Sequence, residues 1–464
     1  FVEQWGRPPE GLILQSVDGG KTLVYGKPAV YPLFIAPFVR LSPTRGAAVA
    51  NALLLALASV MAGRALQKRI GDVAPLWVAA WVFASVTFAY VFWVHSDLFL
   101  MCLVAIALAL MSEKRWAAGA LLAIVMLSRP LYAGLLLAAP AEARKKVAVG
   151  AAALVLVAVL GSLAVRGTWT SYGGDRRSFY SWTGFPAVDD IDWAGQIAER
   201  GTHSWVKEET LRMGFDPRQG GWNAVYYLVG RHVGILPYFL PLVLGFLAFR
   251  RGEGRWALVL SVVLAAAVLF WLRPFNFYGG GGSMANRYFL PLYPALWFLA
   301  ARPVRPLRGA LAAAGVTLLA FPFLLPLWSA PRTFPLATEG GYRYVSDAAR
   351  RWLPFETTLS HLKPSGREDF VHNLLWIRLL SPSLSPDGDR LVLAPGEPGD
   401  ILIGSPRPLE GIEMRRADGT ALRLQPEVRA RHRMWWTDDY YLYELKLDAR
   451  PEGAVFQLFP DWRG

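Results

Sequence analysis

The chain of 464 residues contains a single cysteine, Cys102, and only six histidines. One cysteine cannot form a disulfide within the chain, and it cannot build the cysteine clusters of structural zinc sites. Charged residues are also scarce, at 18% of the chain, whereas soluble domains carry about 25%. The sequence has no P-loop, dinucleotide-binding fingerprint, His-Glu-x-x-His helix or nucleophile elbow, so no motif supports a common class of soluble enzyme.

Apolar residues are abundant instead. Hydrophobic residues make up 54% of the chain, and the mean hydropathy is +0.31. They gather in blocks of about 17 to 22 residues, the length that crosses roughly 30 Å of hydrocarbon. The sequence therefore predicts an α-helical polytopic membrane bundle within residues 1–330. The candidate spans are 44–63, 75–94, 98–112, 117–141, 147–165, 234–249, 256–272, 287–301 and 308–327.

The net charge of +13 comes largely from short basic clusters at the ends of these apolar blocks. They are not arranged along one polar face, so we do not expect a nucleic-acid partner. All five clusters fall on one side of the bilayer if 117–141 is a hairpin that turns at Ser128-Arg129-Pro130, where proline breaks the helix. The positive-inside rule places that side in the cytoplasm. The clusters begin at Arg64, Lys114, Arg144, Arg250 and Arg302.

Three segments of different character are predicted on the outer side. Residues 166–233 are rich in Trp, Tyr, Gly and charge, and we expect them to form a cap over the bundle. Residues 331–464 contain short strand-like runs separated by Asp-Gly and Pro-Gly turns, which predict a soluble extracytoplasmic, mainly-β domain of sandwich type. The apolar segment 29–41 contains Pro32 and Pro37, so it should lie at the membrane surface or in the bundle mouth rather than cross.

The loop 273–288 is the strongest candidate for a binding site. Four consecutive glycines, Gly279 to Gly282, let a ligand approach the backbone amides, and the helix that follows favours anions at its N-terminus. Two arginines flank the glycines and would grip a lipid phosphate or pyrophosphate. The alternative is a flexible turn whose arginines reach lipid headgroups. The residues that we assign to phosphate binding here are Arg273, Gly280, Gly281, Asn286 and Arg287.

Other polar residues lie at the outer ends of the spans. Arg129, at the hairpin tip, either faces a cavity that binds the donor phosphate or snorkels to the interface. Asp97, in the turn His95-Ser96-Asp97, either lines the same cavity or caps the next helix, and the cap is the favoured interpretation. Asp18, in the first loop, is either a base or a solvated charge.

The predicted outer cap contains residue types that hold sugars. Asp190 and Trp193 form one group, and Trp222 belongs to a second. Aromatic faces stack on sugar rings and carboxylates accept hydrogen bonds from hydroxyls, so these residues are candidates for binding an acceptor. The favoured alternative is an ordinary belt of aromatic residues at the membrane interface.

Several of these segments together resemble the GT-C superfamily, the polytopic glycosyltransferases that take sugars from polyprenyl-phosphate donors. The resemblance covers roughly residues 1–330. It implies an inverting transfer on the outer face of a bacterial inner membrane, with the C-terminal domain in the periplasm and arginines on the donor phosphate. It rests on Tyr25–Phe38, on the His-Ser-Asp turn, on Leu127–Pro130 in a broken helix, and on Gly279–Pro294 at the start of a late span.

The resemblance also implies an acidic base in the first outer loop, just after the first transmembrane helix. No such helix precedes that loop here, so we expect the base and at least one more helix upstream of Phe1. Within the chain, Asp18 and Asp97 are the residues that we assign to catalysis. Some members of the superfamily use a divalent cation, but the sequence shows no clear cluster for a metal, and no cofactor is assigned.

Two other functions are weighed against the enzyme. The main alternative is a non-catalytic membrane subunit that keeps the scaffold and binds partners of a membrane complex through its outer domain. A transporter or lipid flippase is less favoured, because we find neither paired charges within the spans nor an inverted repeat.

Overall fold

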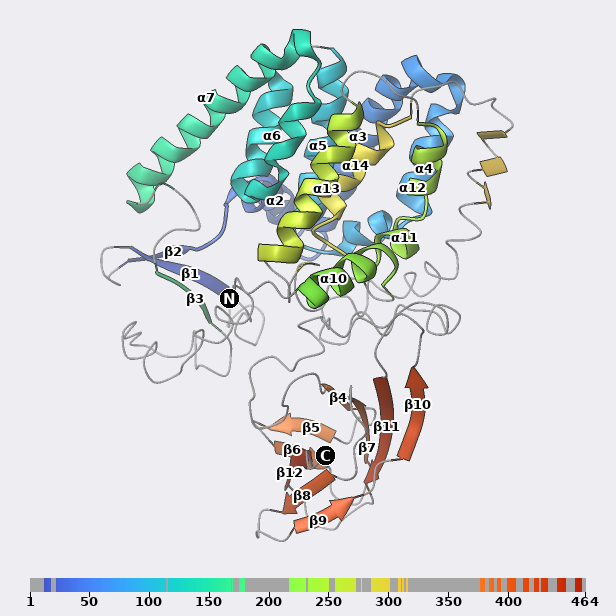
Figure 1. Ribbon diagram of the computed structural model, residues 1–464. Coiled ribbons are helices and arrows are strands. Elements are labelled where there is room, and N and C mark those ends of the chain that lie inside the picture. Colours follow the sequence, from blue (N-terminus) through green and yellow to red (C-terminus); the bar gives the residue numbers. More distant parts are fainter. Residues whose placement is uncertain are drawn as a thin grey trace. The chain divides into compact units, whose positions relative to one another are not determined.

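A computed structural model of the chain contains a helical part and a set of strands (Figure 1). The chain divides into two compact units, which are described separately. The first comprises residues 1–212, 239–268 and 288–320, and the second comprises 213–238, 269–287 and 321–464. The structure describes residues 12–17, 22–113, 116–167, 169, 175–179, 217–230, 233–249, 255–272, 277, 285–300, pairs of residues between 308 and 315, and the strands between 376 and 460.

The described part of the first unit is mainly helical. Its helices are α2 (Val30–Leu41), α3 (Gly46–Ile70), α4 (Ala74–Phe83), α5 (Ser96–Ser112), α6 (Ala117–Ser128), α7 (Ala141–Arg166), α12 (Leu242–Leu247), α13 (Arg255–Leu272, whose last turn belongs to the second unit) and α14 (Tyr293–Trp297). Its 3-10 segments are η2 (Gly71–Val73), η3 (Val86–Phe92), η4 (Pro130–Ala138) and η6 (Leu290–Leu292).

A small antiparallel sheet also belongs to the first unit. Its strand order is β2 (Thr22–Tyr25), β1 (Leu12–Val17) and β3 (Asp175–Phe179). Leu14 of β1 is the register partner of both Tyr25 and Arg177. The sheet therefore joins the first loop to the segment after α7, and neither strand pairing was predicted from the sequence.

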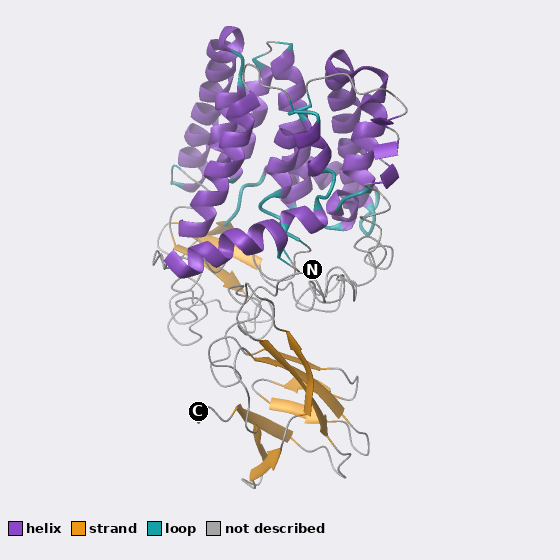
Figure 2. Cartoon of the chain, turned by 45° about the vertical axis from the view of Figure 1, so that its right-hand side comes forward, coloured by secondary structure: helices purple, strands orange, loops and turns teal. Residues whose placement is uncertain are grey.

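Helix α5 forms the core of the first unit. Every residue from Leu98 to Met111 is buried, as expected for a helix that is apolar on all sides. Helices α3 and α6 both contact α5, and they run beside it in Figure 1; Figure 2 shows the helices of the chain in purple. Helix α5 thus lies between α3 and α6.

Helix α7 packs on α6 through small residues. A Cβ atom added to Gly119 of α6 would collide with the carbonyl of Val147 in α7, and one added to Gly150 of α7 would collide with the carbonyl of Trp116. Glycines at such a crossing let two helix backbones approach closely. Beyond its charged first turns, α7 has many exposed apolar side chains: Val149, Leu156, Val157, Leu160 and Val165 are between 56% and 73% exposed.

In the part of the chain that the structure describes, two helical stretches are long and apolar enough to cross a membrane. They are Gly46–Phe83, which comprises α3, η2 and α4, and Ala141–Val165 of α7.

The predicted break at Arg129 is confirmed, since α6 ends at Ser128 and the chain continues as the 3-10 segment η4. The predicted spans 98–112 and 256–272 correspond to α5 and α13. The span 308–327 lies largely outside the described residues.

Three predicted spans are not single helices. In 75–94, α4 ends at Phe83, and the Ser85 hydroxyl donates to the Trp81 carbonyl (2.5 Å) and accepts from the Thr87 amide (3.3 Å), which diverts the chain into η3. The spans 234–249 and 287–301 divide into short helices that contain or follow prolines, because a proline ring excludes the preceding turn. Segment 29–41, by contrast, forms one 12-residue helix, α2, despite Pro37 inside it.

The second unit contains α10 (Pro217–Val229), α11 (Ile235–Tyr238) and two antiparallel sheets. The strands of both sheets lie between residues 376 and 460, in the segment for which the sequence predicted short strands. One sheet has the order β10 (Glu427–His432), β11 (Tyr440–Leu447), β7 (Gly399–Ser405), β4 (Trp376–Leu379). The other has the order β5 (Leu384–Asp387), β6 (Arg390–Leu393), β12 (Val455–Pro460), β8 (Ile412–Arg416), β9 (Ala421–Leu424).

Candidate functional site

Asp97 lies in the first turn of α5, and its side chain is fully buried. The favoured prediction that Asp97 caps this helix is wrong. The helix begins at Ser96, so His95 occupies the N-cap position, and no side-chain cap hydrogen bond is made there. Two side chains contact the Asp97 carboxylate instead, and one of them comes from the break that follows α6.

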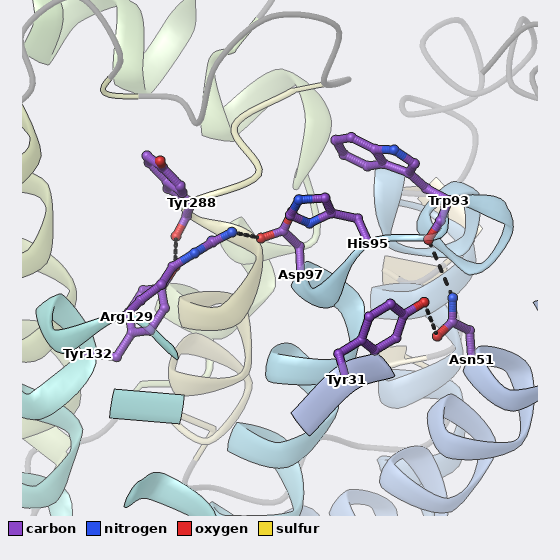
Figure 3. A network of polar contacts seen from close by, with 8 residues as sticks. All are labelled: Tyr31, Asn51, Trp93, His95, Asp97, Arg129, Tyr132 and Tyr288. Carbon is purple, nitrogen blue, oxygen red and sulfur yellow. Dashed lines mark hydrogen bonds and ion pairs between the residues drawn. The ribbon is translucent and has the colours of Figure 1, made fainter. Parts of the chain in front are cut away.

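The first partner is Arg129. This residue lies between α6 and η4 in an extended conformation, which Pro130 imposes on the residue before it. Its Nη2 atom forms an ion pair with Asp97 Oδ1, so the structure brings together two residues that the sequence had singled out separately (Figure 3). The Arg129 side chain is only 13% exposed, and the pair therefore lies almost entirely out of water.

Two tyrosines complete the surroundings of Arg129. Its Nη1 atom donates to the Tyr132 hydroxyl (3.2 Å), and that hydroxyl donates to the backbone carbonyl of Tyr288 (2.9 Å). The guanidinium carbon also lies 4.5 Å from the centroid of the Tyr288 ring, in a cation–π arrangement. Residues from α5, from η4 and from the segment before η6 thus meet at one guanidinium.

The second partner of Asp97 is His95. Its Nδ1 atom lies 2.7 Å from Asp97 Oδ2, and its side chain is 24% exposed. The imidazole ring lies against the indole of Trp93, with ring centroids 5.2 Å apart and planes inclined by 33°. The Asp97 carboxylate is therefore divided, with one oxygen toward Arg129 and the other toward His95 (Figure 3).

Asn51 holds the backbone that leads into His95. This asparagine lies in α3 and is buried, and its Nδ2 atom donates to the carbonyls of Val91 (3.1 Å) and Trp93 (3.4 Å). Its Oδ1 atom accepts from the Tyr31 hydroxyl of α2 (3.3 Å). Sequence reasoning missed Asn51, although a lone amide in the apolar stretch of α3 was a signal of an internal polar contact.

Only part of the glycine loop is described. Asn286 is buried, and its amide donates to the carbonyl of Phe277 (3.4 Å), so it closes the loop rather than presenting its amide to a ligand. Ala285 adopts a φ of 55°, a left-handed conformation that residues other than glycine seldom take. Arg287 is half-buried. The remaining residues of the predicted phosphate site, Arg273, Gly280 and Gly281, lie outside the described residues.

Two of the three predicted acceptor residues, Asp190 and Trp193, lie outside the described residues, and so does Asp18. Trp222 is described: it lies in α10, is half-buried, and stacks on Tyr226 with ring centroids 5.7 Å apart and planes inclined by 19°. One face of its indole is therefore already directed at another aromatic ring.

Among the described residues, no group of three or more His, Cys, Asp or Glu side chains could hold a metal ion. Comparisons of the chain with protein-family models, with curated proteins and with solved structures find no significant match.

Proposed function

We propose that the chain is a membrane glycosyltransferase that moves a sugar from a polyprenyl-phosphate donor to an acceptor on the outer face of a bacterial inner membrane. The observation that carries this proposal is the buried Asp97–Arg129 pair at the start of α5, with the partly exposed His95 beside it. Burying two charges is unfavourable unless they are well paired. Ionisable residues inside a membrane bundle are therefore functional candidates by default.

The exposed surface of α7 supports a place in the bilayer. Only 17% of its most apolar stretch is buried, although the helix is long enough to span. A helix that is apolar on all sides and little buried would be unstable in water and is suited to lipid. With the basic clusters in the cytoplasm, the start of α5, the glycine loop and the C-terminal mainly-β domain would face the periplasm.

Arg129 would hold the donor phosphate. A guanidinium carries five N–H donors, and the contacts with Asp97 and Tyr132 use one on each of two nitrogens. The positive end of α5 adds to the attraction for an anion. We keep Arg287 as a second candidate for binding the donor phosphate.

Donor binding and transfer test this proposal directly. The full chain in nanodiscs would be titrated with polyprenyl-phosphate sugars, and transfer would be followed with a radiolabelled donor. Arg129→Met should weaken donor binding at least tenfold and abolish transfer. Arg69→Met is the matched control, because Arg69 is likewise a partly buried arginine over an aromatic ring: it lies 5.9 Å from the centroid of the Phe298 ring and donates to the Phe298 carbonyl (3.2 Å).

The result that would overturn the proposal is a wild-type chain that neither binds nor uses any polyprenyl-phosphate sugar. Equal donor affinity in Arg129→Met and Arg69→Met would overturn the assignment of Arg129 alone.

One observation favours a second candidate function, a non-catalytic membrane subunit that binds partners through its outer domain. Of the two aspartates that the sequence assigns to catalysis, Asp97 is the one that the structure describes. It is fully buried and paired with Arg129, so it cannot itself touch an acceptor. A chain that binds lipid and retains partner proteins during purification, but transfers no sugar, would support this alternative.

A further inference from the structure

His95 contacts the buried Asp97 carboxylate and is itself partly exposed to solvent. Asp97 has no exposed surface, whereas 24% of the His95 side chain is exposed, and their Oδ2 and Nδ1 atoms are 2.7 Å apart. The His95 Nδ1 atom is itself buried, so the exposed part of the side chain consists of its other atoms. The imidazole thus has one nitrogen directed inward at the carboxylate.

This contact determines where a neutral imidazole carries its proton. Two lone pairs 2.7 Å apart would repel each other, so a neutral imidazole beside this carboxylate favours the tautomer with its proton on Nδ1 and its lone pair on Nε2. The same logic applies in Asp–His pairs of hydrolases, where the carboxylate selects the tautomer and stabilises the imidazolium once it forms. Asp97 has the geometry for that role toward His95.

The surroundings of His95 keep its ring in one place. The Trp93 indole lies against one face, and the His95 amide donates to the Trp93 carbonyl (2.7 Å). That same carbonyl accepts from Asn51 of α3 (3.4 Å). A side chain that was merely a surface residue would not need support from α3, α5 and the segment between η3 and α5.

A transfer from a phosphate donor needs a positive charge near the leaving phosphate as well as a base, and Arg129 supplies that charge. It neutralises the other oxygen of Asp97 and brings positive charge to the same cluster as His95. A base and a cation at one carboxylate suit a reaction in which a proton is removed from one reactant while negative charge grows on the other.

We propose that His95 is the catalytic base of the sugar transfer, in place of the acidic residue that the resemblance implies upstream of Phe1, and this inference rests on the proposed function. The hydroxyl oxygen of the acceptor attacks the anomeric carbon of the donor, and its proton passes to His95 Nε2. The bond between the anomeric carbon and the phosphate oxygen breaks, and its electron pair remains on the polyprenyl phosphate, whose charge faces Arg129. Asp97 and Asn51 act as positioning residues.

His95→Asn is the informative variant, because the asparagine amide can replace Nδ1–H as the donor to Asp97 but offers no base. We expect donor affinity to stay within about twofold of wild type, while kcat falls by about 10²- to 10⁴-fold, the usual contribution of a general base. Added imidazole should restore part of kcat in His95→Asn and none in Arg129→Met. His432→Asn, in β10 of the second unit, is the matched control and should keep wild-type kcat.

A second readout does not depend on transfer. Diethyl pyrocarbonate acylates a neutral, accessible imidazole, and mass spectrometry would locate the adduct among the six histidines of the chain. We expect His95 to react in the wild type and to react more slowly in Asp97→Asn.

The outcomes separate the two proposals. Wild-type transfer that His95→Asn retains within about twofold would overturn the base but leave the glycosyltransferase standing. A wild type that transfers from no polyprenyl-phosphate sugar would overturn the function and the base with it. A His95 that is inert to diethyl pyrocarbonate would show that Nε2 is inaccessible and would also overturn the base.

Discussion

The carboxylate of Asp97, in the first turn of α5, forms an ion pair with the guanidinium of Arg129, at the break between α6 and η4. Since Asp97 is fully buried and Arg129 nearly so, each charge depends on the other. This relationship leads to the first prediction and underlies the proposed chemistry.

Removing one member of the pair should destabilise the protein more than replacing both. Asp97→Leu leaves the Arg129 charge buried without its partner, which costs about 3–5 kcal/mol. The double variant Asp97→Leu/Arg129→Met should lose much less, because no charge is then left unpaired. Unfolding in a mixed-detergent titration would measure both. A double variant as unstable as the single one would show that the pair is not coupled.

Asn51 should matter for both stability and turnover. Asn51→Leu leaves the buried carbonyls of Val91 and Trp93 without their donor, and each such loss costs about 1–3 kcal/mol. If Asn51 positions His95, kcat should fall while donor affinity changes little. Tyr31→Phe is the milder comparison, because it removes only the hydroxyl that donates to Asn51 Oδ1. A loss of stability in Asn51→Leu with unchanged kcat would assign it a purely structural role.

Two helical glycines should respond to alanine with opposite signs. At Gly119 an added methyl meets the backbone of α7, so Gly119→Ala should destabilise the α6–α7 contact by roughly 1–3 kcal/mol, the usual cost of overpacking. At Gly161 of α7 nothing lies within 4 Å. Gly161→Ala should therefore stabilise α7 by up to about 1 kcal/mol through helix propensity alone. Thermal unfolding of the two variants would measure the difference, and equal shifts would contradict the packing.

The proposed topology can be read from single cysteines. The native Cys102 is buried in α5 and should not react with a maleimide. Val94, just before His95, is 60% exposed, and Lys145 at the start of α7 is also exposed. In intact spheroplasts, Val94→Cys should react with a membrane-impermeant maleimide, and Lys145→Cys should react only after permeabilisation. The reverse pattern would place the proposed site in the cytoplasm.

Local patterns were sufficient for some parts of the fold. The break at Arg129 follows from Pro130, which excludes a helical turn before it, and it was predicted correctly. Apolar length marked out α5, α7 and α13. The division of 75–94 was not predicted, because it depends on the hydroxyl of Ser85 bonding to Trp81 and Thr87, a local polar choice that hydropathy does not register.

The candidate site was only half visible in the sequence. Asp97 and Arg129 were both noticed, but Asp97 was assigned to a cap because a capping aspartate needs only its own helix. Its actual partner comes from the break between α6 and η4, and the tyrosines around Arg129 come from η4 and from the chain before η6. The contribution of His95 could not be weighed without knowing that Asp97 is buried and His95 is not.

The sequence by itself determined which segments are apolar, where prolines interrupt them and where along the chain the basic clusters lie, because these properties depend on neighbouring residues alone. The tertiary structure alone decided which polar groups meet in the interior. Asp97 pairs with Arg129 rather than with its own backbone because α5 and α6 pack side by side and exclude water there, so each buried charge must find the other.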